Sequence, residues 1–384
     1  MKQIVLISNG HGEDMMGAVL AEELMALGYR VAAIPLVGRG RAYLRLGLKP
    51  LGPCQEMPSG GFVLDRPWVF LKDLQAGWIS MSLGHYRAVR QAARTAWATL
   101  VVGDIYGLLV GSVFGCRPLF QVQCLASVRA WQRTGFRRPY SLLERSLMRR
   151  ALGVYPREAE GADWLKAHGV PHATYLGNPM LDALEDGPLE LPPPYLLLLP
   201  GSRHDAYESL PKMLEATRQL ADLPLTPVVA WAGLPLEPLA APGWQLEATA
   251  AQAGLTHRLR HPDGTVVHLS QQAFKGALLG ARIAISTSGT AAEQAAGYGV
   301  PLVGFPTAGP QYTRPFAERQ RRLLGEALLL VEAHPQAIAQ GVRQFLASPE
   351  RLERARADGQ AAMGTPGAAR RIAQAIHQAL QARG

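Results

Sequence analysis

Three residues near the start of the chain have side chains that can exchange protons: His11, Glu13 and Asp14. They follow the apolar run 4–8, and we expect a helix to begin at about residue 15. A histidine or carboxylate in such a loop can act as a general base. Alternatively, one of the two acids only caps the helix and His11 is an ordinary loop residue. The spacing predicts a candidate catalytic loop and leaves the choice among these residues open.

A second candidate base, Asp104, follows the apolar run 100–102 and Gly103. A carboxylate at the carboxyl end of a buried strand is costly unless it is paired or has a function. Asp104 is therefore a better candidate base than the acids of the first loop. Its alternative role is a structural ion pair with an arginine.

In the second half of the chain, the apolar run 195–199 leads into a tight turn with Gly201, Ser202 and Arg203. Glycine and serine can offer a backbone N–H group and a hydroxyl to a diphosphate. The guanidinium of Arg203 can neutralise the charge of that diphosphate. The turn is therefore a candidate phosphate-binding site.

A similar turn carries Ser288, Gly289 and Thr290 where a helix is expected to begin, with Glu293 one turn later. The N-terminus of a helix can bind phosphate, and a carboxylate can accept both hydroxyls of a ribose. Each turn alone is equally compatible with phosphate binding and with a plain connection between a strand and a helix. Because both turns follow strands of one predicted sheet, together they favour a nucleoside diphosphate. A Walker motif is absent, which disfavours NTP hydrolysis.

Four other polar residues of the second half are candidates for donor binding. Gln311 lies in the loop after an apolar run, where its amide can bind sugar hydroxyls, and Gln320 and Glu318 are weaker candidates. A plain surface loop is the alternative for this stretch. His268, the last residue of the run 265–268, completes the set of donor-binding candidates.

Short apolar runs alternate with amphipathic stretches, which predicts parallel sheets built from strand–helix–strand units. The strands expected before the proline-rich stretch 187–194 are 4–8, 30–35, 100–102, 119–123, 153–155 and 173–176. Those expected after it are 195–199, 227–230, 265–268, 282–286, 302–305 and 328–331. The fold class is therefore α/β with two doubly wound halves.

The proline-rich stretch marks the expected domain boundary, because it suits neither a helix nor the interior of a sheet. We expect Rossmann-like domains over 1–186 and 195–366, the linker 187–194 between them, and a C-terminal helix within 367–384. Ligands of such sheets bind at the carboxyl ends of the strands. A cleft between the two domains is the expected site.

The net charge of +9 is unevenly distributed along the chain. Residues 1–180 contain 21 basic and 12 acidic side chains, whereas residues 181–384 contain 18 of each. A basic half indicates an anionic surface or substrate contacted by that half only, and a solvated basic face is the alternative. The sequence shows no pattern typical of nucleic-acid binding, so we expect no nucleic-acid partner.

Three cysteines without metal-binding spacing are typical of a reducing cytoplasm. No run reaches the ~18 uncharged apolar residues of a membrane span, so any membrane contact is expected to be peripheral. The segment 62–81 mixes aromatic residues such as Trp68 with basic residues, which suits a membrane interface. A buried amphipathic helix is the alternative for this segment.

Several of these motifs resemble those of the lipid A disaccharide synthase family, which are glycosyltransferases of the GT-B fold. The matches are 198–203 with Glu208, 288–293, 299–303, 176–182, Asp14 with Gly17, and Gly103 with Asp104. More loosely, the chain is similar to the peptidoglycan lipid-linked N-acetylglucosaminyltransferase and to UDP-N-acetylglucosamine 2-epimerases. The histidine of the first loop looks more like that of the peptidoglycan enzyme.

The resemblance implies two Rossmann-like domains facing a central cleft, with the C-terminal helix returning to the first domain. It implies a UDP-sugar substrate, of the UDP-N-acetylglucosamine or UDP-glucose type, held by the second domain. It also implies inversion at the anomeric carbon without a metal or cofactor, and a lipid-linked acceptor at the inner face of the cytoplasmic membrane. An epimerase-like enzyme and a non-catalytic nucleotide-sugar binding protein are the alternatives.

Overall fold

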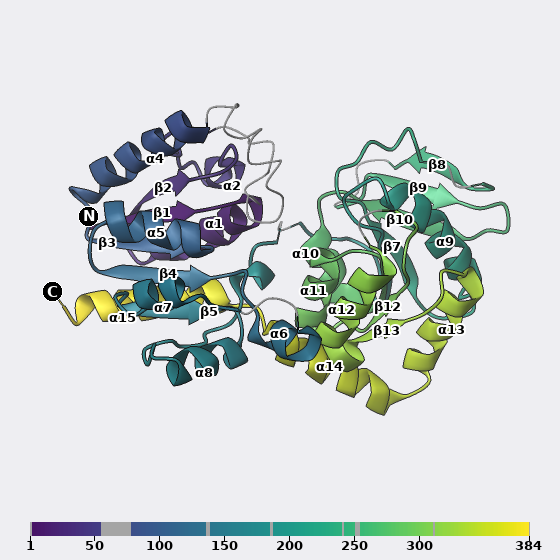
Figure 1. Cartoon of the computed structure of the whole chain (residues 1–384). Helices are drawn as coiled ribbons and strands as arrows, with labels where there is room; N and C mark the ends of the chain where they lie inside the picture. The colour runs from purple at the N-terminus through teal and green to yellow at the C-terminus, as the bar shows by residue number, and fades with distance from the viewer. Residues whose placement is uncertain are drawn as a thin grey trace. The chain divides into compact units, whose positions relative to one another are not determined.

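The computed structural model describes residues 2–54, 78–135, 139–184, 187–239, 242–249, 254–309 and 312–383. The chain forms two compact units (Figure 1). Unit 1 comprises Met1–Ala183 and Pro366–Gly384, and unit 2 comprises Leu184–Thr365. By this division the proline-rich stretch 187–194 lies inside unit 2.

Unit 1 is built around a five-stranded parallel sheet with the order β2-β1-β3-β4-β5. The strands are β1 Gln3–Ser8, β2 Arg30–Pro35, β3 Ala98–Val102, β4 Leu119–Gln123 and β5 Gly153–Pro156. β3 and β4 are buried along their whole length, as expected for a parallel sheet covered on both faces. All five strands were predicted, but the predicted strand 173–176 is wrong. That stretch forms only an isolated bridge between Val154 and Ala173.

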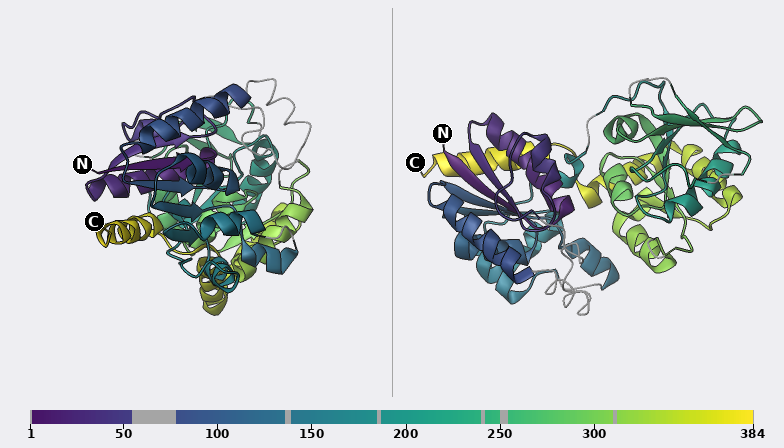
Figure 2. Two further views of the ribbon diagram at one scale, coloured as in Figure 1. Left: turned by 60° about the vertical axis from the view of Figure 1, so that its left-hand side comes forward. Right: turned by 90° about the horizontal axis from the view of Figure 1, so that it is seen from above.

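Helices cover both faces of this sheet (Figure 2). They are α1 His11–Ala26, α2 Arg41–Arg45, α4 Trp78–Ala93, α5 Ile105–Phe114, α6 Val128–Thr134, α7 Leu142–Met148, α8 Ala159–Ala167 and α15 Ala368–Gln381, with the 3-10 turn η2 Pro179–Leu181. On one face, Ile372 of α15 joins Leu6 of β1 in a buried apolar cluster. On the other face, Val89 of α4 and Leu108 of α5 pack in a cluster with Val5.

The last helix, α15, belongs to unit 1 although it lies at the far end of the chain. Its side chains Ile372 and Ile376 are fully buried in the cluster that also contains residues of α1. The carboxylate of Asp182 accepts hydrogen bonds from the backbone N–H groups of Gly367, at 2.5 Å, and Ala369, at 2.7 Å. The expected return of this helix to the first domain is therefore confirmed.

Unit 2 contains an eight-stranded sheet with the order β13-β12-β11-β6-β7-β10-β9-β8. The strands are β6 Tyr195–Leu199, β7 Thr226–Ala230, β8 Gln245–Ala248, β9 His257–Arg260, β10 Val266–Ser270, β11 Ala281–Ser286, β12 Leu302–Gly304 and β13 Leu328–Leu330. The helices are α9 Ala206–Arg218, α10 Phe274–Gly280, α11 Thr290–Gly297, α12 Arg314–Leu324, α13 Pro335–Leu346 and α14 Pro349–Met363, with the 3-10 turn η3 Gly325–Ala327. In neither unit is a described helix long and apolar enough to cross a membrane.

The six predicted strands of unit 2 are its parallel strands, and the antiparallel strands β8 and β9 were missed. β8 has no buried residue, and Leu259 alone is buried in β9. These strands pair partly through surface charge, because Arg258 Nε lies 2.5 Å from Glu247 Oε2. A strand with so little apolar surface gives no periodic signal in the sequence.

Candidate functional site

The ionisable residues of unit 1 collect at the carboxyl ends of its parallel strands. β1 and β3 are in register, so that Ser8 lies level with Val102. Asn9 and Asp104, which follow these strands closely, therefore belong to the same edge of the sheet. This is the edge at which doubly wound sheets bind ligands.

The first turn of α1 carries two buried carboxyl groups. The helix begins at His11 rather than near residue 15, so Glu13 and Asp14 belong to the helix and not to a loop. Their exposed fractions are 7% and 2%. The N-cap position is taken by Gly10, and a Cβ atom there would collide with the Glu13 carboxylate. His11 is exposed.

Asp14 is held by a chain of hydroxyl groups. The Ser8 hydroxyl donates to Asp14 Oδ1 at 2.6 Å, and the fully buried Tyr43 hydroxyl donates to Ser8 Oγ at 2.8 Å. Burial raises the pKa of Asp14 to about 7, the hydrogen bond from Ser8 opposes this rise, and the charge of Glu13 adds to it. This carboxyl is therefore partly protonated at neutral pH, where it can give or accept a proton.

Glu13 links the first turn of α1 to the turn that carries Asp104. A Cβ atom on Gly103 would lie 3.4 Å from Glu13 Cγ, so the Glu13 side chain lies against this turn. Burial raises the pKa of Glu13 to about 7, a hydrogen bond to its own backbone lowers it, and the charge of Asp104 raises it. The two candidate base regions predicted separately from the sequence are therefore one electrostatic cluster.

Asp104 is half-buried and is the N-cap residue of α5. Its Oδ1 accepts hydrogen bonds from the backbone N–H groups of Tyr106, at 3.0 Å, and Gly107, at 3.3 Å, and from Asn9 Nδ2 at 2.9 Å. Within the described part of the chain it has no arginine partner, so the ion-pair alternative is wrong there. None of the described residues donates a hydrogen bond to the second oxygen, Oδ2, so this atom can accept one from a ligand.

Asn9 is a functional candidate that the sequence analysis missed. Its side chain is 8% exposed, and its Oδ1 has no hydrogen-bond partner among the described residues. A buried carbonyl oxygen without a partner is costly, and a bound hydroxyl group would satisfy it. The sequence signal that could have identified Asn9 is its position directly after β1. Its contact with Asp104 is seen only in the structure.

Glu144 was also missed, because it lies on α7 and gives the sequence pattern of an ordinary surface acid. It is buried, and burial raises its pKa to about 7. A hydrogen bond from the backbone at Ser141 lowers this pKa, the charge of Asp104 raises it, and a hydrogen bond from Gln123 lowers it. The carboxyl edge of unit 1 therefore carries four acids that interact through their charges.

In unit 2, the two predicted phosphate-binding turns follow neighbouring parallel strands. Leu199 at the end of β6 lies level with Ser286 at the end of β11. The Thr287 hydroxyl donates to the Pro200 carbonyl oxygen at 3.1 Å, and this bond joins the two turns. Gly201 has a φ of 102°, in the left-handed region that favours glycine.

The turn before α11 is fixed by side chains from the segment around α12. Gln320 Nε2 donates to the carbonyl oxygens of Ser288, at 3.3 Å, and Gly289, at 2.8 Å. The buried Tyr312 hydroxyl donates to Gln320 Oε1 at 2.7 Å. Gly289 is the N-cap residue of α11, so the first helical N–H group is that of Thr290. The turn is held in one geometry at a helix N-terminus.

Asp205 connects the first turn to the same segment and was not predicted. It is buried and accepts hydrogen bonds from Thr307 Oγ1, at 3.0 Å, and from the backbone N–H of Tyr312, at 3.4 Å. The strand-end segments 200–205 and 286–290 therefore form one connected network with Thr307, Tyr312 and Gln320. This network presents the predicted donor-binding side chains, which are the exposed Ser202, Arg203 and Thr290 and the partly buried Ser288 and Glu293.

His268 does not lie with these turns. β10 extends to Ser270, and His268 lies two residues before that end, level with Val228 of β7. Burial lowers the pKa of His268, as does the positive charge of Arg258. The expectation that His268 ends its strand is wrong, because Leu269 and Ser270 continue the pairing. Gln311 lies outside the described residues.

No family model matches the chain, and no curated protein sequence matches it. Solved structures do resemble it along its whole length. The calicheamicin glycosyltransferase CalG4 is 18% identical with a TM-score of 0.62, over 99% of this chain and 98% of that chain. MurG from Acinetobacter baumannii is 14% identical with a TM-score of 0.56, over 98% of this chain and 100% of that chain.

A third similar structure is the UDP-GlcNAc 2-epimerase from Neisseria meningitidis, solved with bound UDP-GlcNAc. It is 14% identical with a TM-score of 0.52, over 98% of this chain and 100% of that chain. At such identities the similarity establishes the fold alone. The chain therefore has the GT-B type of fold, with two Rossmann-like α/β domains, as its sequence predicted.

Proposed function

We propose that this chain is a glycosyltransferase that moves a sugar from a UDP-sugar to an acceptor hydroxyl, with inversion at the anomeric carbon. The observation that carries this proposal is the joined pair of turns at the carboxyl edge of unit 2. There the hydrogen bond from the Thr287 hydroxyl to the Pro200 carbonyl oxygen connects the turn 286–290 to the turn 200–203. A calicheamicin glycosyltransferase and an epimerase solved with UDP-GlcNAc share the fold and support it.

The donor would be bound by unit 2 through its diphosphate and ribose. Arg203 would neutralise the diphosphate, and the N-terminus of α11 at Thr290 would donate to a phosphate oxygen. Ser202 and Ser288 would add hydroxyl donors, and Glu293 would accept the ribose hydroxyls. These fixed donors would stabilise the negative charge that develops on the leaving UDP.

The acceptor hydroxyl would be deprotonated by the acidic cluster of unit 1. We assign the base to Asp104, which is oriented by Asn9 and by the first amides of α5. As the acceptor oxygen attacks the anomeric carbon, its proton moves to the carboxylate and the bond to the UDP oxygen breaks. Glu13 is the second candidate, because its pKa of about 7 suits proton transfer at neutral pH. His11 and Asp14 are weaker candidates.

We further propose that the acceptor is lipid-linked and that the chain works in the cytoplasm, attached peripherally to the inner face of the membrane. The excess of basic residues in 1–180 supports this part of the proposal, because anionic lipid headgroups attract such a surface. Of the aromatic segment 62–81, predicted as a membrane contact, residues 62–77 lie outside the described residues, and 78–81 form the start of α4.

A UDP-N-acetylglucosamine 2-epimerase activity is the second candidate, and one observation favours it. Glu13 and Asp14 both have a pKa of about 7, so at neutral pH one can be ionised while the other is protonated. An epimerase needs such a pair, because it removes a proton from the sugar and returns one to the opposite face. It would act on the UDP-sugar without any acceptor.

Calorimetric titration with UDP, UDP-glucose, UDP-N-acetylglucosamine and UMP tests the donor site. We expect UDP to bind, and Arg203→Ala and Glu293→Ala each to weaken that binding by about 10- to 100-fold, the usual effect of losing a charged hydrogen bond. Arg282→Ala, an exposed arginine at the start of β11, serves as the matched control. If no uridine nucleotide binds, the proposed function is wrong.

Product analysis separates the two candidate reactions. The protein is incubated with each UDP-sugar alone and then with lipid extracts as acceptors. A transferase releases UDP only when the acceptor is present, whereas an epimerase converts the free UDP-sugar into its epimer. Epimer formation without an acceptor would contradict the transferase proposal and leave the donor site intact.

A further inference from the structure

The exposed side of α4 carries one leucine and a row of arginines. Leu83, Arg87 and Arg90 are exposed at helical spacing, and Arg94 follows directly after the helix. Residues separated by three or four positions lie on the same side of a helix. The four side chains therefore form a single stripe along α4.

The neighbouring helix α5 packs against α4 and adds exposed apolar side chains. Leu109 is 40% exposed and Val113 is 60% exposed, and their spacing places them on one side of α5. On α7, which packs against α5, Leu142 and Leu143 are also exposed. Large exposed apolar residues gathered on neighbouring helices are typical of an interaction surface.

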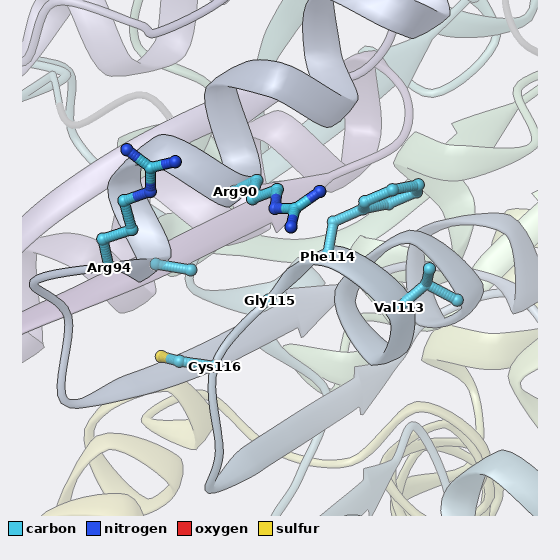
Figure 3. A pocket seen from close by; sticks show the side chains of 7 residues that line it. Arg90, Arg94, Val113, Phe114, Gly115 and Cys116 are labelled. Atoms are coloured by element: carbon cyan, nitrogen blue, oxygen red, sulfur yellow. The ribbon is translucent and has the colours of Figure 1, made fainter.

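A pocket of about 450 Å³ opens between the C-terminal ends of α4 and α5. Figure 3 shows Arg90 and Arg94 lining one side of it, and Val113, Phe114 and Cys116 lining the other. The Phe114 ring is stacked on Tyr86 of α4, with their centres 4.5 Å apart. Packing therefore holds the Phe114 wall of this pocket, and the rim combines two guanidinium groups with an apolar side chain.

The arginines of this surface are unpaired with any residue that the structure describes. Arg87, Arg90 and Arg94 make no hydrogen bond or ion pair there. In the sequence from 78 to 143 there are eight arginines and a single acid, Asp104. No acidic side chain of the described residues pairs with the stripe, so its positive charge attracts an anionic partner.

This pocket is separate from the acidic cluster of unit 1. Arg94 lies between the end of α4 and β3, and Cys116 lies between the end of α5 and β4. Both therefore lie at the amino-terminal edge of the parallel sheet. The carboxylates of Glu13 and Asp104 lie at the opposite, carboxyl-terminal edge. A ligand in the pocket would not occupy the proposed catalytic site.

We infer that the surface formed by α4 and α5 binds an anionic phospholipid bilayer, with a lipid phosphate in the pocket between Arg90 and Arg94. Leu83, Leu109 and Val113 would enter the interfacial region of the bilayer. Arginine stems pack well at such an interface while their charged ends reach the phosphates. This inference rests on the membrane part of the proposed function and names the surface that would carry it.

The combination of charge and apolar side chains favours a bilayer over a soluble anion. A free phosphate or nucleotide would use the two guanidinium groups but would leave Leu109 and Val113 in water. A lipid bilayer offers phosphates and a less polar layer at the same surface. The arginines indicate that the partner is anionic. The exposed apolar residues beside them favour a lipid headgroup over a soluble anion.

Sedimentation of the full-length protein with phospholipid vesicles tests the inference. Vesicles of phosphatidylcholine alone are compared with vesicles that also contain phosphatidylglycerol. We expect binding to the anionic vesicles only, weakened by added salt. Each arginine near an anionic surface contributes a factor of about five, so Arg90→Ala with Arg94→Ala should weaken binding about 25-fold. Leu109→Ser with Val113→Ser should also weaken it at constant charge.

Matched controls are the exposed arginines Arg282 and Arg354 and the exposed Leu279, all in unit 2. Changing these arginines to alanine, or Leu279 to serine, should leave vesicle binding as in the wild type. Circular dichroism and thermal unfolding of the same samples show whether each variant is folded, and UDP binding, measured by calorimetry, tests the donor site separately. If the wild type does not bind anionic vesicles, or the Arg90 and Arg94 variant binds equally well, the inference is wrong whatever the UDP result.

Discussion

The carboxyl edges of the two sheets are built from opposite chemistry. In unit 1 this edge holds the buried acids Glu13, Asp14 and Glu144, each with its pKa raised to about 7 by burial. In unit 2 the same edge holds small residues, hydroxyl groups and the exposed Arg203, and its backbone turns are held by side-chain hydrogen bonds. One edge suits proton transfer, and the other suits the binding of a charged phosphate ester.

The difference shows how one type of fold can divide two tasks. Proton transfer near neutral pH requires carboxyl groups in a poorly solvated environment, which destabilises the protein when they ionise. Binding a diphosphate requires fixed donors at a solvent-accessible turn, which places no charge in the core. The contrast yields three predictions, each of which alters one side of the comparison.

The largest effect is expected from Asp104→Asn. The amide keeps the hydrogen-bonding geometry at the start of α5 but cannot accept the proton. Turnover should therefore fall by at least ~100-fold, the typical contribution of a general base to the reaction rate. Turnover is measured with saturating donor, and UDP affinity should not change. Asp163→Asn, an exposed acid on α8, is the control. If Asp104→Asn does not lower turnover this far, the assignment of the base to Asp104 is wrong, and a loss of this size in His11→Ala would assign the base to His11 instead.

The second prediction concerns the stability of unit 1. The pKa of Glu13 rises from its ordinary value of 4.5 to about 7 on folding. The folded state therefore holds this proton more tightly, and the free energy of unfolding falls as pH rises through that range. Glutamine does not ionise, so Glu13→Gln should abolish this fall in stability at high pH. The variant should have a free energy of unfolding about 3 kcal/mol higher than the wild type at pH values above ~8, and a similar one below ~4.5.

Denaturant unfolding of wild type and Glu13→Gln across this pH range measures the effect. Glu22→Gln, an exposed acid on the same helix, should leave the pH dependence as it is in the wild type. Equal stabilisation by Glu13→Gln at low and high pH would contradict the raised pKa. The same variant should lower turnover if Glu13, rather than Asp104, is the base.

The smallest effect is expected from the side chains that hold the turn before α11. Gln320→Leu leaves the Ser288 and Gly289 carbonyl oxygens and the Tyr312 hydroxyl without their partner. Misplacement of the turn should weaken UDP binding by about tenfold, the equivalent of one hydrogen bond. Tyr312→Phe should have a smaller effect in the same direction.

Calorimetry with UDP measures both changes. Gln344→Leu, at an exposed position of α13, is the matched control. Unchanged UDP affinity in Gln320→Leu would show that this turn does not contact the nucleotide. The turn with Arg203 would then be the remaining candidate for phosphate binding. A loss of affinity greater than that of Arg203→Ala would show that turn geometry outweighs charge.

The parallel strands were predictable because each is a short apolar run, and some were predicted to the residue, as for Leu119–Gln123. The turns after β6 and β11 were predictable because they follow such runs directly. Glu144 was not, because it comes from a helix and becomes part of the acidic cluster only through packing. The start of α1 was predicted too late, since Gly10 replaces the usual polar cap. β8 and β9 were missed because almost none of their residues are buried.

The position of α15 has a consequence for the order in which the chain folds. Unit 2 is a continuous segment, Leu184–Thr365, inserted into unit 1. During synthesis from the N-terminus, unit 2 is therefore complete before the ribosome has made Ile372 and Ile376, which fill the core of unit 1. Until then, the apolar cluster that residues of β1 and α1 form in the first 183 residues lacks the side chains of α15. We therefore expect a chain ended after Thr365 to fold unit 2 alone.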